Sequence, residues 1–204
     1  MMDARNAILA RIRSAIADAP TPEPVPRGYH RKPMSGPGDV EKFAHTVDDY
    51  RAQVHRAHES MVAEIVTGLI AEGARAVVPA DLPESWRPRR GVVVDGAPAE
   101  LSTLELDAID VVVTGCTLGI AATGTIVLDG GVGQGRRALT LVPDHHICVI
   151  RADQIVDTVP QAFHALDATR PLTFISGPSA TSDIELNRVE GVHGPRTLDV
   201  VIVR

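Results

Sequence analysis

The first apolar residues of the chain recur at three- and four-residue spacing, the period of an amphipathic helix. They are Ala4, Ile8, Ile12, Ala15 and Ile16. The pattern predicts a helix over residues 3–18 with Asp3 as its N-cap. Six prolines and three glycines follow between Ala19 and Asp39, which favours an extended or disordered linker. We therefore expect residues 1–39 to form a helical arm and linker, with the apolar stripe packed on its own domain or on a partner.

Helical spacing also predicts two further helical regions. The first runs over residues 40–73, and Gly73 is a residue type that commonly ends helices. Its apolar face begins with Phe43, Val47, Tyr50 and Val54. The second helix covers residues 152–166, and Pro160 is expected to kink or split it. Its expected inward-facing residues are Ile155, Val156, Val159, Phe163 and Leu166.

Short apolar runs alternate with these helices and predict the strands of a sheet. The expected strands are Ala76–Val78, Gly91–Val94, Ile109–Val113, Thr125–Leu128, Leu139–Val142, Ile147–Ile150, Leu172–Ile175 and Leu198–Val203. Runs that are apolar on both faces are typical of parallel strands covered by helices on both sides. The gaps between residues 125–128, 139–142 and 147–150 are too short for helices, which predicts antiparallel pairs there. We therefore expect an α/β domain over residues 40–204 with an open, mostly parallel (mixed) sheet and helices on both faces.

Composition and charge narrow the function classes. Hydrophobic residues make up 44% of the chain and aromatics only 3%, so the core must be built mainly from Val, Ile, Leu and Ala. The net charge of −6 argues against binding to nucleic acid or to an anionic membrane surface. No apolar run is long enough for a membrane helix, and the charged N-terminus lacks a signal-peptide pattern, so we expect a cytoplasmic protein. The two cysteines, Cys116 and Cys148, exclude a disulfide framework and a CxxC site for zinc or an iron–sulfur cluster.

Small and hydroxyl residues gather in the segment 114–125. Glycines there let backbone N–H groups approach a ligand, and the hydroxyls of Thr123 and Thr125 are suited to a carboxylate or a phosphate. Thr123, Gly124 and Thr125 are therefore candidate ligand-binding residues. A tight connection that needs glycine for its backbone conformation explains the same segment equally well.

A glycine-rich segment covers residues 129–137. Its sequence matches neither of the usual nucleotide-binding patterns, GxGxxG and GxxxxGK[ST]. Its composition favours a flexible surface hairpin loop. Arg136 is its one candidate binding residue, because a guanidinium can donate two hydrogen bonds to an anion.

The densest polar segment directly follows the expected strand 172–175. Ser179 or Thr181 could cap a short helix that carries Asp183 and Glu185, and the N–H groups at its start would bind an anion. Candidate ligand-binding residues here are Ser176, Gly177, Ser179, Thr181, Glu185, His193, Gly194 and Arg196, with His193 and Asp183 as catalytic candidates. Capping and turn formation alone are the alternative explanation. A Ser–His–Asp catalytic site is disfavoured because SGPS is not the GxSxG pattern.

Histidine spacing does not predict a metal site. His145 and His146 are adjacent in an expected strand, so their side chains point to opposite faces. His55 and His58 share a face of the expected helix, but no third ligand is placed with them. We therefore expect no metal on this chain.

Four motifs occur in the order seen in the lactate utilization protein C family of bacterial LUD-domain proteins, and the chain resembles that family over residues 40–204. They are Gly119-Ile120-Ala121-Ala122-Thr123-Gly124-Thr125, Val142-Pro143-Asp144-His145-His146-Ile147, SGPSxTxDIE at residues 176–185 and GVHGP at residues 191–195. The resemblance implies a fold like that of the ribose-phosphate isomerase, glucosamine-phosphate deaminase and CoA-transferase group. It also implies a role in L-lactate oxidation to pyruvate beside two partner subunits that carry iron–sulfur clusters.

One position departs from the family pattern. The family usually has Glu in the AETGT segment, whereas this chain has Ala122, which can act neither as a nucleophile nor as an acid or base. The leading hypothesis is therefore a cluster-free subunit of a lactate-oxidising complex with a small-anion pocket. The alternatives are a stand-alone enzyme acting on a phosphosugar or an acyl-CoA, and a purely structural adaptor that uses the N-terminal arm.

Overall fold

The computed structural model describes residues 4–18, 37–181, 189–190 and 194–204, in two separate units, Met1–Lys32 and Pro33–Arg204. The first unit contains helix α1 (Ala4–Ala15), which confirms a helix at this place, and Asp3 lies outside the described residues. None of the residues of α1 is buried, and Ile8, Ile12 and Ile16 are exposed. In the described part of the first unit, these three isoleucines form an apolar stripe that is exposed.

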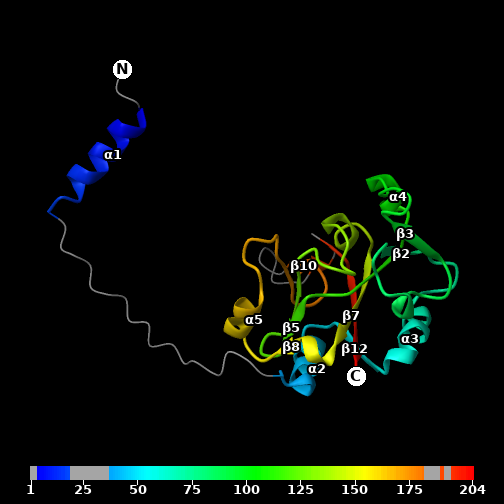
Figure 1. The fold of residues 1–204 in the computed structure, drawn as a ribbon. Coiled ribbons are helices and arrows are strands. Elements are labelled where there is room, and N and C mark those ends of the chain that lie inside the picture. The colour runs from blue at the N-terminus through cyan, green and yellow to red at the C-terminus, as the bar shows by residue number, and fades with distance from the viewer. Residues whose placement is uncertain (1–3, 19–36, 182–188, 191–193) are drawn as a thin grey trace. The chain divides into compact units, whose positions relative to one another are not determined.

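The second unit is built on a six-stranded parallel sheet (Figure 1). Its strands, in spatial order, are β1 (Gln53–Ala57), β12 (Thr197–Val203), β7 (His145–Arg151), β4 (Val111–Thr114), β2 (Ala76–Pro79) and β3 (Val92–Asp95). Valine and isoleucine dominate the central strands because side chains on both faces are buried.

Helices cover both faces of this sheet. Helix α3 (Val62–Leu69) packs on one face against residues such as Val201, and α2 (Val40–Asp49) packs on the other face, which includes Val200. Further short helices are α4 (Thr103–Asp107), η1 (Glu59–Met61), η2 (Glu84–Trp86), η3 (Arg137–Thr140) and η4 (Ala152–Gln154). The α/β class with an open, mostly parallel sheet and helices on both faces is therefore confirmed.

A four-stranded second sheet contains the antiparallel pairs. Its order is β8 (Ile155–Val156), β5 (Leu118–Ile120), β6 (Thr125–Leu128) and β9 (Thr173–Ile175). The pairs β5–β6 and β6–β9 are antiparallel, and α5 (Val159–Ala165) packs on β5 and β6. A two-stranded antiparallel pair is formed by β10 (Ala180–Thr181) and β11 (Val189–Glu190). Of the three runs in which antiparallel pairs were expected, only residues 125–128 (β6) form them, and β7 pairs in parallel with β4 and β12.

The prediction of continuous helix over residues 40–73 is wrong. Helix α2, whose N-cap Asp39 accepts a hydrogen bond from the Lys42 N–H, ends at Asp49, and the edge strand β1 follows before α3. Pairing of β1 with β12 outweighs the helical spacing because it completes the parallel sheet. His55 therefore lies in a strand and shares no helical face with His58.

Two further local predictions are wrong. Residues 139–142 form no strand, since a 3₁₀ turn covers residues 137–140 and buries Leu139. The expected helix over residues 152–166 is divided into η4, β8 and α5, and Pro160 lies in the first turn of α5, where its missing N–H costs nothing. Val159 and Phe163 are therefore exposed rather than directed inward.

Candidate functional site

A cavity of about 330 Å³ lies beside the amino ends of β7 and β12 and is bounded by β9 and the segment that follows it. We call it the His146 cavity. Its polar or loop-derived lining residues include Arg137, Thr140, His146, Ser176, Ser179 and Gly194. Leu141, Phe174 and Leu198 supply apolar lining. A space of this size holds a small organic anion.

His146 is the buried polar group of this cavity. It is the second residue of β7, its side chain is 1% exposed, and its Nε2 lies 2.8 Å from Thr114 Oγ1. Burial lowers the pKa of His146 to about 4, with a smaller contribution from neighbouring His145. The ring is therefore neutral at pH 7. Among the described residues Thr114 is its one hydrogen-bond partner, which leaves the other ring nitrogen for a ligand.

Hydroxyl groups connect the cavity wall to the turn between β5 and β6. Ser176 Oγ lies 2.8 Å from Thr125 Oγ1, which in turn lies 2.7 Å from Thr123 Oγ1. Two other lining residues are joined by a backbone hydrogen bond, in which the Ser179 N–H donates to the Pro195 carbonyl at 2.8 Å. The turn at residues 123–125 and the polar segment that follows β9 thus lie next to each other, although the two threonines do not line the cavity.

The arginines near this site differ in their partners. Arg136 donates two hydrogen bonds of 2.9 Å to Asp95 and another to the Leu101 carbonyl, and it lines an adjoining cavity of about 240 Å³. Arg196 is bound by Asp144. Arg137 lines the His146 cavity and has no ion pair within the described part of the chain. Of these three arginines, Arg137 is therefore the one best placed to bind an anion in the cavity.

The candidate residues from the sequence lie in different places. Ser176, Gly177, Ser179 and Gly194 line the cavity, while Thr123, Gly124 and Thr125 belong to the turn behind Ser176. Arg136 and Arg196 are engaged with aspartates, and Thr181 lies in β10. Asp183, Glu185 and His193 lie outside the described residues.

Sequence analysis missed the two residues that give the cavity its chemistry, His146 and Arg137. A signal for His146 was present, because strand alternation places it on the same inward face as Cys148 and Ile150. A histidine on such a face must satisfy its nitrogens internally or with a ligand. Arg137 gave no comparable signal, since its place depends on the 3₁₀ turn that replaces the expected strand.

Ala122, the position of the family's usual glutamate, lies on the turn between β5 and β6. Its side chain is exposed, and its N–H donates to the Asp157 carbonyl at 3.0 Å. It is not among the lining residues of the His146 cavity. The departure from the family pattern therefore falls outside this cavity.

A buried carboxylate is held between two histidines on the other face of the sheet. Asp199 is 3% exposed, and its two oxygens lie 2.5 Å from His55 Nε2 and 2.6 Å from His145 Nε2. Burial opposes its ionisation, but the hydrogen bonds from His145 and His55 outweigh burial and lower the pKa of Asp199. Within the described ranges no three His, Cys, Asp or Glu side chains are arranged to hold a metal ion. These three groups serve instead to join β1, β12 and β7.

Replacing Asp199 by asparagine is expected to lower the free energy of unfolding at pH 7 by about 2 kcal/mol, because two hydrogen bonds to a buried charge are weakened. Its folded pKa lies below the unfolded value, so the ionised carboxylate stabilises the fold above about pH 4. That contribution is lost as the pH falls through the folded pKa. Urea unfolding should therefore show the two proteins converging as the pH falls below about 4. Asp81→Asn, at an exposed position, is the control, and a constant difference at all pH values would contradict this role.

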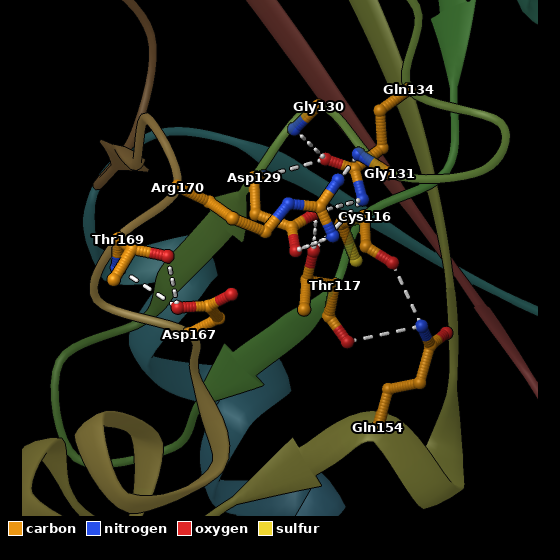
Figure 2. Close-up of polar contacts among 10 residues, drawn as sticks. All are labelled: Cys116, Thr117, Asp129, Gly130, Gly131, Gln134, Gln154, Asp167, Thr169 and Arg170. Carbon is orange, nitrogen blue, oxygen red and sulfur yellow. Dashed lines mark hydrogen bonds and ion pairs between the residues drawn. The ribbon is translucent and has the colours of Figure 1, made fainter.

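The glycine-rich segment 129–135 follows β6 and is fixed by side chains that are themselves buried (Figure 2). Gln134 Oε1 accepts from the Asp129 and Gly130 N–H groups at 2.7 and 3.1 Å, and Asp129 Oδ1 accepts from the Gly131 N–H at 2.9 Å. Thr117 Oγ1 donates to Asp129 Oδ1 at 2.6 Å. Because the segment leads to a 3₁₀ turn and not to a strand, the prediction of a surface hairpin loop is wrong.

Known proteins share this architecture. A crystal structure of a DUF162 family protein from Deinococcus radiodurans matches with a TM-score of 0.70 and 39% identity, covering 81% of this chain and 96% of that one. Lactate utilization protein C of Deinococcus radiodurans is 43% identical over 98% of this chain and 96% of its own length. The protein of that name from Halalkalibacterium halodurans is 32% identical over 54% of this chain and 51% of its own.

The LUD domain matches residues 40–203, from the first residue of α2 to the last residue of β12. In the parts of the chain that the structure describes, no helix is both long and apolar enough to cross a membrane. The matched region contains the three sheets, the His146 cavity and the glycine-rich segment. The chain therefore belongs to the LUD domain family.

Proposed function

We propose that this chain is a cluster-free cytoplasmic subunit of a system that oxidises L-lactate to pyruvate, with iron–sulfur clusters carried by partner subunits. The observation that carries the proposal is 43% identity over 98% of the chain to a protein named lactate utilization protein C. Cys116 and Cys148 are both buried, and no cluster-binding set occurs among the described side chains. In this proposal residues 1–39 form an arm and linker, and residues 40–204 form the LUD domain.

Within this system the His146 cavity is proposed to bind a small carboxylate such as L-lactate or pyruvate. Arg137 supplies the positive charge, and a guanidinium matches the two oxygens of a carboxylate. The free nitrogen of neutral His146 and the hydroxyl of Ser176 supply hydrogen bonds for the oxygen on the second carbon. The backbone of Gly177, Ser179 and Gly194 lets the ligand approach the wall closely.

The contribution of this chain is then binding and orientation, whereas the electrons leave through the partners. Ala122 offers no carboxylate for a covalent intermediate, so the proposal assigns no nucleophile to the turn between β5 and β6. The catalytic candidates from the sequence, His193 and Asp183, lie outside the described residues.

A strain that lacks this chain and any other route of L-lactate oxidation is expected to lose growth on L-lactate, and the intact chain should restore it. Calorimetry should detect binding of L-lactate or pyruvate to the purified chain. Arg137→Gln should weaken this binding about tenfold, because a charge-assisted hydrogen bond is lost. Arg90→Gln removes one exposed charge elsewhere and is the matched control. Normal growth of the deletion strain would contradict the pathway, while equal binding by the two variants would contradict the cavity.

A further inference from the structure

A second cavity of about 330 Å³ lies at the opposite edge of the parallel sheet. The neighbouring strands β4 and β7 end there at Thr114 and Arg151, and the residues that follow each strand line the space. We call it the carboxyl-edge cavity. Its polar lining includes Cys116, Thr117, Gln134, Arg151, Gln154 and Arg170. Open α/β sheets hold their ligands at this edge, outside the carboxyl ends of parallel strands.

The walls of the carboxyl-edge cavity are fixed before any ligand arrives. Gln154 Nε2 donates to the Cys116 and Thr117 carbonyls at 2.8 and 3.2 Å, which fixes the segment that follows β4 (Figure 2). On the other side, Gln134 Nε2 donates to Thr117 Oγ1 at 2.8 Å and to Asp129 Oδ1 at 3.0 Å. A ligand therefore enters a preformed space and does not need to order a loop.

Two guanidinium groups line this space from different elements. Arg170, which is 43% exposed, places Nη1 2.8 Å from Asp129 Oδ2. Arg151, at the end of β7 and 52% exposed, places Nε 3.0 Å from Asp153 Oδ1. Each guanidinium has five N–H donors, so both retain donors after these contacts.

Two arginines and one acidic residue line the cavity, and Asp153, which pairs with Arg151, is an exposed residue outside the lining. Asp129 is the one acidic residue among the lining residues, and it is buried beneath hydrogen bonds from Thr117, Gly131 and Gln134. Asp129 is therefore held by the wall and by Arg170, while both arginines remain partly exposed and keep N–H donors for a further anion.

We propose that the carboxyl-edge cavity binds the phosphate group of a small phosphorylated molecule, with Arg151 and Arg170 as its binding residues. A phosphate has oxygens in several directions and can accept hydrogen bonds from two guanidinium groups on different walls. A carboxylate has two coplanar oxygens and suits a single guanidinium. This site is separate from the His146 cavity and does not depend on the role in lactate oxidation.

Trp86 is the one tryptophan of the chain and lines the carboxyl-edge cavity, so its fluorescence reports on this site and not on the His146 cavity. The full chain should be titrated with inorganic phosphate and pyrophosphate, with acetate as the comparison, at constant ionic strength. We expect a saturable change in Trp86 emission with the phosphates, and calorimetry on the same samples should give the same affinity. Absence of both signals, or equal affinity for acetate, would overturn the proposal.

The two arginines are tested separately. Arg170→Gln and Arg151→Gln should each weaken phosphate binding about tenfold or more, through the loss of charge-assisted hydrogen bonds. Arg90→Gln makes the same change in net charge at an exposed position away from the cavity and should bind phosphate as the parent chain does. Circular dichroism establishes that each variant is folded. Equal weakening in all three variants would reveal a general charge effect and would overturn the assignment.

Discussion

Replacing Gly124 by alanine is expected to destabilise the fold by about 3 kcal/mol, which combines backbone strain with overpacking. Gly124 has a φ of +57°, a conformation that disfavours residues with a Cβ atom. A Cβ there would also lie 2.7 Å from the Thr46 carbonyl carbon and 2.8 Å from the Val47 nitrogen. These are backbone atoms of α2, so they cannot move aside as a flexible side chain would.

Urea unfolding followed by circular dichroism measures this loss. Gly73→Ala is the matched control, because Gly73 also has a positive φ (+82°) but no atom lies within 4 Å of the position of its Cβ. The control should therefore lose only the strain contribution, about 1 kcal/mol. Equal losses in the two variants would show that the contact with α2 contributes nothing.

Gly124 also shows what could and could not be read from the sequence. A glycine between threonines was equally consistent with a ligand-binding loop and with a tight turn. The close approach of the turn to α2 accounts for the glycine by packing, and this approach depends on residues about 80 positions apart in the chain. No local pattern contains that information.

The parallel sheet was largely predictable because the sequence signal for most of its strands is local. Strands such as β4 and β7 are continuous apolar runs because both of their faces are buried, and such runs are visible without knowing the neighbours. The edge strand β1 was missed because its five residues include only two apolar ones, Val54 and Ala57, which show no regular alternation. Residues 53–57 form a strand because they pair with β12, and not because of their own sequence pattern.

The His146 cavity could be predicted from the sequence only in part. Sequence analysis brought forward the segments that form its wall, around Ser176 and Gly194, because polar residues followed a strand. The histidine within the cavity was passed over, because it was weighed as a metal ligand and not as a buried hydrogen-bonding group. Its burial is a property of the assembled sheet, since β9 and the segment after it cover the face on which it lies.

Burial of neutral His146 makes the stability of the fold depend on pH. Its folded pKa of about 4 lies below the value of about 6.5 expected in the unfolded chain. Between these values the unfolded state holds one proton more, so the free energy of unfolding falls as the pH is lowered, by about 1.4 kcal/mol per pH unit. The expected loss from this one residue is about 3 kcal/mol between pH 7 and pH 4.

Replacing His146 by glutamine removes the titrating ring and keeps groups that can hydrogen-bond to Thr114. The variant is expected to be less stable at pH 7, because a buried ring is lost, but to lose about 3 kcal/mol less than the parent chain on going to pH 4. Urea unfolding at several pH values measures the slope, which is independent of the offset at pH 7. His164→Gln, which removes an exposed ring on α5, is the control for loss of a histidine. Parallel curves for the parent chain and His146→Gln would mean that His146 binds protons equally in the folded and unfolded states. The pKa of His146 would then not be lowered by burial, which would contradict a neutral ring in the cavity.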